Sequence, residues 1–168
     1  MNARAIVYLA VMVLAGCGTT KSEAQTVSDR SPYLSVCRPT TGGAELLLFD
    51  SRLAGGVQST AFFTISGKKL AKLVSFPATW NETVPKRIKG LPAEADHYMM
   101  QRGANMEGQR ILSGYELIMP MKTVPVGQQM VGEDQLRLRH DGRLWTATCR
   151  QLDPNSEEYH RFLAGEVE

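Results

Sequence analysis

The residues best suited to covalent or metal chemistry are three cysteines and three histidines. They are Cys17, Cys37, Cys149, His97, His140 and His160. No histidine has a cysteine, an acid or a second histidine at a recognised metal-ligand spacing, and no CxxC pair occurs in the sequence. Asp96 precedes His97, but sequence neighbours point apart on the helix that we predict there. We therefore expect surface histidines, with no metal site and no cofactor.

Recognisable catalytic motifs are also missing from the sequence. Ser113-Gly114 lacks the rest of a G-x-S-x-G nucleophile elbow. The glycine pairs at 42–43 and 55–56 lack the P-loop lysine and the dinucleotide-binding spacing, which indicates turns. The sequence thus predicts a protein that is not an enzyme. The alternative is an envelope hydrolase with a scattered active site, which a cleft holding an acid or histidine of strongly shifted pKa would favour.

Cys17 stands at the end of a segment that is typical of a secretory signal. A short positive region at 1–4 is followed by an apolar run at 5–14 and then by Leu14-Ala15-Gly16-Cys17. The apolar run is shorter than the roughly 20 residues that cross a hydrocarbon core. The last four residues resemble the bacterial lipobox. This resemblance implies a lipoprotein: residues 1–16 are a cleaved signal peptide, and Cys17 carries a diacylglyceryl group and an acyl chain such as palmitate.

The resemblance also implies a location. Several acyl chains on one residue anchor a protein stably, whereas a single chain binds a membrane only marginally. Gly18 replaces the Asp that commonly retains Gram-negative lipoproteins in the inner membrane. We therefore expect a lipid anchor in the outer membrane, on its periplasmic side. Residues 17–31 include the lipidated cysteine and a polar, flexible tether, and residues 32–168 are predicted to be a single domain.

Cys37 and Cys149 are the two cysteines that remain after lipidation. An exported chain meets an oxidising compartment, so an even pair predicts a disulfide. The bridge would join the first predicted strand to the last. Closing a loop of about a hundred residues is worth up to roughly 4.7 kcal/mol in the chain-entropy model.

The strongest local fold signal is a hairpin at Asp141-Gly142, since Asp-Gly between alternating apolar and polar residues is typical of a type I′ turn. Its register places Leu138 opposite Trp145 and directs two arginines, at 137 and 139, to the other face. A second hairpin is predicted at 66–69. Its register sets Ile65 opposite Leu70, Ala61 opposite Val74 and Phe63 opposite Lys72.

Other segments complete the predicted fold. Tyr33–Cys37, Leu46–Phe49 and a segment at 111–119 are expected strands, the second of them buried on both faces or partly covered by a helix. Residues 78–90 are expected to be irregular, residues 92–102 helical, and a C-terminal helix is expected to open at Asp153-Pro154. These patterns predict a mainly β fold: a small antiparallel barrel or sandwich with one or two short helices and a disulfide between strands.

Composition narrows the possible partners. The formal net charge is +2 with acids and bases mixed along the chain, which argues against nucleic acid. We expect a non-catalytic, protein-binding domain, either an accessory subunit of an envelope assembly or an immunity-type factor. Six methionines between 99 and 130 form either an adaptable binding face or ordinary core.

An alternative is the inhibition of a wall-degrading enzyme. The predicted plan is similar to that of periplasmic lysozyme inhibitors of the lipoprotein type, which combine a lipobox, a small antiparallel barrel and a disulfide between strands. Their inhibitory motif does not align with this chain, so the similarity concerns architecture only.

Overall fold

The computed structural model describes residues 32–41, 46–54, 56–84 and 88–167. The lipobox, Cys17 and the predicted tether lie outside the described residues. The described chain forms strands and one helix in the order β1 (Tyr33–Thr41), β2 (Leu46–Ala54), β3 (Val57–Ser66), β4 (Lys69–Val84), β5 (His97–Glu107), β6 (Arg110–Val124), β7 (Gly127–Met130), β8 (Asp134–His140), β9 (Arg143–Gln151) and α2 (Glu157–Ala164). None of the described helical sequence is both long and apolar enough to cross a membrane.

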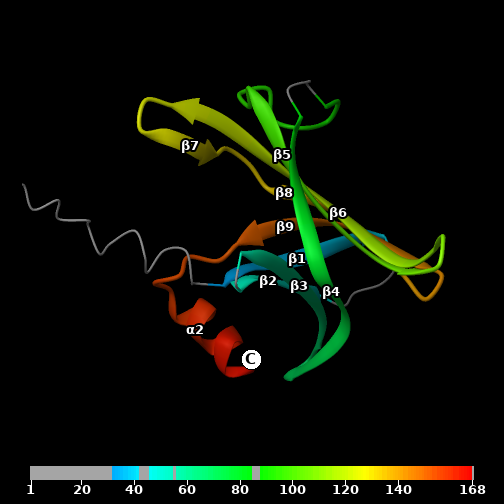
Figure 1. Ribbon diagram of the computed structural model, residues 1–168. Coiled ribbons are helices and arrows are strands. Elements are labelled where there is room, and N and C mark those ends of the chain that lie inside the picture. Colours follow the sequence, from blue (N-terminus) through cyan, green and yellow to red (C-terminus); the bar gives the residue numbers. More distant parts are fainter. Residues whose placement is uncertain (1–31, 42–45, 55, 85–87, 168) are drawn as a thin grey trace, which may run out of the picture.

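Eight strands form a closed antiparallel barrel. Their order is β5-β4-β3-β2-β1-β9-β8-β6, and pairing between β5 and β6 closes the circle (Figure 1). The short β7 pairs only with the far end of β6, beyond the closed part of the barrel. Closure removes the exposed sheet edges that invite aggregation. The predicted mainly β fold is therefore confirmed, and a barrel rather than a sandwich is formed.

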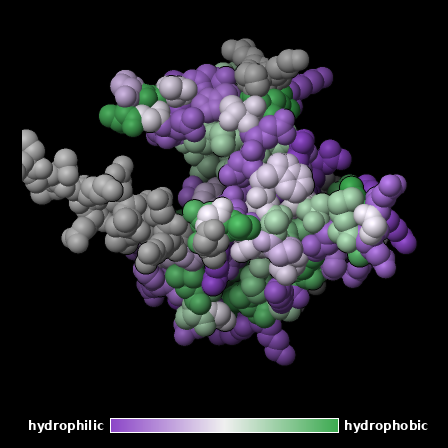
Figure 2. All heavy atoms as spheres, viewed as in Figure 1, coloured by the Kyte–Doolittle hydropathy of each residue, from purple (hydrophilic) through white to green (hydrophobic). Residues whose placement is uncertain are grey.

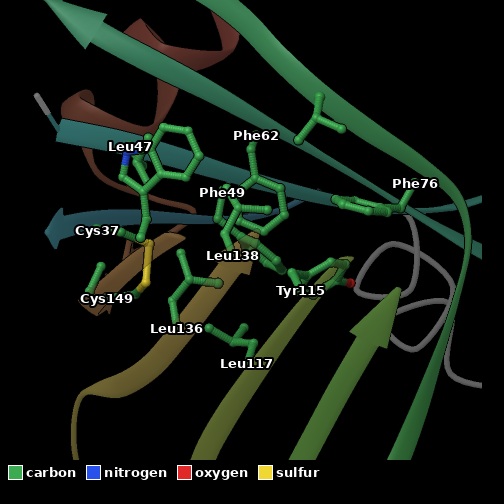
Figure 3. Close-up of a cluster of buried hydrophobic side chains, with 13 residues drawn as sticks. Cys37, Leu47, Phe49, Phe62, Phe76, Tyr115, Leu117, Leu136, Leu138 and Cys149 are labelled. Atoms are coloured by element: carbon green, nitrogen blue, oxygen red, sulfur yellow. A yellow bond between two sulfur atoms is a disulfide. The ribbon is translucent and has the colours of Figure 1, made fainter. Parts of the chain in front are cut away.

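The barrel interior is filled by alternate residues of the strands, with an aromatic cluster at its centre (Figure 3). Phe49, Phe62, Phe76 and Tyr115 meet mostly edge to face, with ring centroids 4.9–6.1 Å apart, a geometry that suits their quadrupoles. A Cβ atom at Gly103 would lie 2.6 Å from a Tyr115 ring carbon. Only glycine therefore lets Tyr115 lie across β5.

The predicted disulfide is present. Cys37 on β1 and Cys149 on β9 are directly opposite in register and are bonded, and both are buried. Figure 3 shows the bridge beside Leu136 on the wall of the core. Because β1 and β9 are the first and last strands, the bond joins the two ends of the barrel's chain.

The Asp141-Gly142 hairpin is confirmed. Both residues have positive φ, 48° and 72°, as a type I′ turn requires. Leu138 pairs with Trp145 as predicted. Trp145 is 3% exposed, whereas the side chains at 137 and 139 lie on the outer face.

The second hairpin is correct near its turn and wrong further away. Ile65 pairs with Leu70 and Phe63 with Lys72, as predicted. A β-bulge between Phe62 and Phe63 then shifts the register, so Val74 pairs with Phe62 and not with Ala61. A bulge adds one unpaired residue to a strand. Here the extra residue is Leu73 on β4, and it brings Val74 and Phe76 to the inner face opposite Phe62 and Thr60, where both are buried.

The helix predicted at 92–102 is not formed. His97–Glu107 is strand β5, and it pairs along its length with β6 and over part of it with β4. Residues 78–84, predicted to be irregular, continue β4. Pairing with two neighbours satisfies the backbone of β5 and closes the barrel, which outweighs the local helical preference of the segment.

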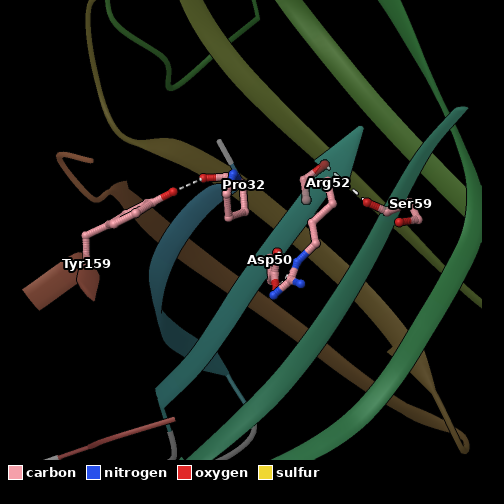
Figure 4. Close-up of polar contacts among 6 residues, drawn as sticks. Pro32, Asp50, Arg52, Ser59 and Tyr159 are labelled. Atoms are coloured by element: carbon pink, nitrogen blue, oxygen red, sulfur yellow. Dashed lines mark hydrogen bonds and ion pairs between the residues drawn. The ribbon is translucent and has the colours of Figure 1, made fainter. Parts of the chain in front are cut away.

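The C-terminal helix is present but begins at Glu157, three residues beyond the predicted Asp153-Pro154 start. The Ser156 side chain caps it by accepting a hydrogen bond from the Tyr159 N–H, and Gly165 ends it at φ 78°. Tyr159 packs against Leu34 and Leu152, and its hydroxyl donates to the Pro32 carbonyl at 2.7 Å (Figure 4). The helix thus covers part of the outer face of the barrel, which explains the double-sided burial of β2.

Candidate functional site

Two rows of side chains run side by side across the outer wall of the barrel. The first row follows the pairings Trp80–Arg102, Arg102–Glu116 and Glu116–Arg137 from β4 to β8. Because paired residues point to the same face of a sheet, these four side chains are neighbours. The second row lies one step along the strands and consists of Ala104, Gly114, Arg139 and Leu144.

A hollow lies where the small residues Ala104 and Gly114 leave the sheet uncovered. The hollow holds ≈ 300 Å³ and is lined by Trp80, Arg102, Gly103, Ala104, Ile111, Gly114, Tyr115, Glu116, Arg137, Arg139 and Leu144. We call this surface the Trp80 groove. Figure 2 shows pale and green atoms running toward the tip of the β5–β6 hairpin, with purple, hydrophilic atoms on either side. Trp80 is 50% exposed there, and Ile111 and Leu144 are also exposed.

The charges of the Trp80 groove are unbalanced. Three arginines face one glutamate, Glu116. Arg102 is held by Glu116 at 2.9 Å and by Glu82 at 3.1 Å. Arg137 and Arg139 make no ion pair with the described residues and are exposed. The groove therefore presents two uncompensated positive charges beside an exposed indole ring.

A second hollow of ≈ 310 Å³ lies between α2 and the outer faces of β1, β2 and β9. It is lined by apolar residues and by charges of both signs, with Arg38, Arg150 and Arg161 as well as Glu133 and Glu158. Arg150 is paired with Glu158 at 2.9 Å. The lining of this hollow includes no exposed aromatic side chain comparable to Trp80. It is therefore the weaker candidate of the two for a protein-binding surface.

Polar side chains on the inner face of the sheet, ranging from buried to exposed, form a closed ring of hydrogen bonds. Around the ring, contacts of 2.8, 3.2, 3.2, 2.9, 2.9 and 3.4 Å link in turn Ser51, Gln58, Asn81, Gln101, Tyr115 and Thr60. Burial raises the pKa of the Tyr115 phenol to about 12, so it stays neutral. Because the members satisfy one another, the ring joins five strands and leaves little capacity to bind a ligand.

An acid is buried in the described part of the barrel beside the disulfide-bonded strand β9. Asp134 is fully buried at the start of β8 and accepts a hydrogen bond from the Tyr33 hydroxyl at 2.8 Å. Its other oxygen, Oδ1, has no hydrogen-bond partner in the described part of the chain. Burial raises the pKa of Asp134 to about 7. The carboxyl is nevertheless inaccessible to a substrate, so the shift reflects a buried core acid rather than a catalytic one.

Two of the three histidines, which were all predicted to be exposed, are partly buried. His160 is exposed and His140 is half-buried beside Asp141, but the side chain of His97 is only 12% exposed. Its Nδ1 contacts an Asp96 carboxylate oxygen, because the two residues lie at a strand end and not on a helix. No group of three or more His, Cys, Asp or Glu residues in the described part of the chain is placed to hold a metal.

The structure also shows where the six methionines and Trp80 lie. The six methionines do not share one face: Met100 is buried, Met106 is exposed, and the other four are half-buried. The sequence did not predict Trp80 as a functional residue, because it falls in a segment predicted to be irregular. Nothing near it in the sequence indicates that it lies beside Arg102, since that proximity arises from the pairing of β4 with β5.

Comparisons of the chain with protein-family models, with curated proteins and with solved structures find no match. The functional argument therefore depends on the geometry of the chain itself.

Proposed function

We propose that this chain is a lipid-anchored envelope protein whose barrel binds another protein, without catalysis, through the Trp80 groove. The lipobox supports the anchor and, with Gly18, a position on the periplasmic side of the outer membrane. The observation that carries the binding proposal is the exposed Trp80 ring beside a hollow with two unpaired arginines.

These residue types and their setting favour a protein interface. Tryptophan and arginine are enriched among the residues that dominate binding energy at interfaces. The groove lies on paired strands of a closed barrel, so it is held in place before binding and little conformational entropy is lost on association. A partner that inserts an apolar side chain over Gly114 would bury Trp80, Ile111 and Leu144 together.

The hydrolase alternative receives less support. The acid with the strongly raised pKa, Asp134, is buried, and both non-lipid cysteines are in the disulfide. Inhibition of a wall-degrading enzyme is a special case of protein binding. The variants described next test it when lysozyme inhibition is measured in place of affinity.

The proposal is tested by truncating the exposed Trp80 side chain and, separately, by filling the hollow with a larger residue at Gly114. A photocrosslinking residue at Leu144 should give a discrete adduct in intact envelopes, from which the partner is identified and purified. Trp80→Ala should then weaken binding of the purified partner by about 30-fold, which corresponds to the 2 kcal/mol of an interface hot spot. Gly114→Leu should weaken binding similarly by filling the hollow, since a Cβ there meets only ordinary contacts of 3.4 Å or more.

Leu53→Ala is the matched control, because Leu53 is 52% exposed on β2 and lies outside the groove. It should leave the affinity within twofold of the unmodified protein. Equal affinities for Trp80→Ala, Gly114→Leu and Leu53→Ala would contradict binding at the Trp80 groove.

A further inference from the structure

Soft metal ligands gather on the inner face of the sheet where β5, β6 and β7 extend beyond the barrel. The pairings are His97–Met121, Met99–Met119 and Met121–Met130. Paired residues, and residues two apart on one strand, point to the same face. One imidazole and four thioethers therefore form a continuous patch, and all five side chains are half-buried.

His97 is oriented as metal-ligating histidines are. Asp96 accepts a hydrogen bond from the Thr123 N–H at 2.9 Å, and its other carboxylate oxygen contacts His97 Nδ1. These two contacts fix the carboxylate against the imidazole ring. When Nδ1 donates its hydrogen to Asp96, Nε2 carries the lone pair. A carboxylate that holds the far nitrogen of the ring is the usual second partner of a histidine ligand.

The other ring nitrogen of this histidine is buried. Nε2 of His97 has no hydrogen-bond partner among the described residues, although buried polar atoms are nearly always paired. The side chain directly opposite is Met121, a thioether that offers lone pairs but no strong hydrogen bond. A bound cation would accept the lone pair of His97 Nε2 and would explain why this buried nitrogen has no hydrogen bond to the described residues.

Hydroxyl groups lie close to two of the methionine sulfur atoms. The Thr83 hydroxyl lies 3.3 Å from Met99 Sδ and the Tyr33 hydroxyl lies 4.0 Å from Met119 Sδ. Each thioether has a second lone pair left for a metal. Thioether and imidazole ligands without a thiolate select soft, low-charge ions such as Cu(I), whereas hard cations such as Mg²⁺ require oxygen ligands. We propose that His97, Met99, Met119 and Met121 bind Cu(I), with Asp96 as a positioning residue.

This site is independent of the Trp80 groove. The groove lies on the outer wall, and none of the four proposed ligands lines it. Met130 is the fourth thioether on the patch and lies next to Met121. Met100, by contrast, is the neighbour of Met99 that points to the opposite face of β5.

The test is a titration of the full mature protein in detergent with Cu(I), kept reduced by ascorbate under anaerobic conditions, in competition with bicinchoninate. We expect one equivalent to bind. Methyl resonances of carbon-13-labelled methionine should shift at residues 99, 119 and 121 and not at residues 100 and 106. Met119→Leu and Met121→Leu conserve side-chain volume, and each should lower the affinity at least tenfold. His97→Gln should lower it further.

Asp96→Asn should weaken Cu(I) binding 10- to 100-fold, as loss of such a second partner does, with the methionine shifts retained at saturation. Met106→Leu is the matched control and should change affinity less than twofold, because Met106 is exposed near the far end of β5. Thermal melting establishes that each variant is folded. Failure to compete with bicinchoninate, unchanged affinity of Met121→Leu, or tighter binding of Zn²⁺ than of Cu(I) would each overturn the proposal.

Discussion

The buried carboxyl of Asp134 makes the stability of this protein dependent on pH in a defined direction. Its pKa is 3.8 in an exposed setting and about 7 in the fold, because burial penalises the charged form. Between these values the folded state binds a proton that the unfolded state has released. The free energy of unfolding therefore falls as the pH rises from 4 to 7, and the loss is complete above pH 7.

The size of the effect follows from the same values. A carboxyl whose pKa rises from 3.8 to about 7 on folding costs about 4 kcal/mol when it is ionised. Asp134→Asn removes the charge, and its side-chain oxygen can still accept the hydrogen bond from Tyr33. We expect the variant to be more stable than the unmodified protein at pH 8, by up to about 4 kcal/mol, and equally stable at pH 4.

The assay is urea unfolding between pH 4 and 8 with the disulfide intact, followed by tryptophan fluorescence. The difference between the two proteins isolates Asp134 from the other carboxylates and the histidines. Asp153→Asn serves as the control because Asp153 is exposed, and it should keep the pH dependence of the unmodified protein. An Asp134→Asn variant that is less stable at pH 8, or whose stability falls with pH as steeply as before, would refute the argument.

Three further perturbations test the anchor and the hairpin. Cys17→Ser should lose incorporation of labelled palmitate and should leave the membrane fraction or remain unprocessed; normal labelling would contradict the lipobox. Gly142→Val should destabilise the domain by more than about 1 kcal/mol, measured in urea, because the residue stands at φ 72°. Trp145→Ala should cost roughly 3–5 kcal/mol, as the loss of a large buried side chain does. In a Trp80→Phe background, ready quenching of Trp145 emission by iodide would be inconsistent with its 3% exposure.

The predicted features that are confirmed depend on a few neighbouring residues or on a simple residue count. Asp141-Gly142 specifies its turn because both positions need positive φ, and the alternation around it sets Leu138 against Trp145. The Cys37–Cys149 bond was predicted by counting, since the proposed lipidation of Cys17 would leave one pair of cysteines. The C-terminal helix ends at Gly165 because glycine adopts the left-handed conformation at little cost.

The predictions that are wrong concern segments whose partners are distant in the sequence. Residues 92–102 have a helical pattern of apolar residues. Residues from His97 onward nevertheless form strand β5, because this strand pairs with both β4 and β6 and so closes the barrel. The bulge at Leu73 turns Val74 and the Phe76 ring toward the core, opposite Phe62 and Thr60 on β3, and no local pattern in the sequence indicates this shift. His97 is half-buried for the same reason, since its neighbours are decided by the pairing of β5 with β6.

The sequence by itself determined the turns, the cysteine pair, the β-rich class and the signature of a lipid anchor, because each depends on local conformation or on composition. Only the tertiary structure decided barrel closure, the position of Trp80 beside Arg102 and Gly114, and the gathering of His97 with four methionines. Those arrangements arise from strand register, in which backbone hydrogen bonds between distant segments choose which side chains share a face.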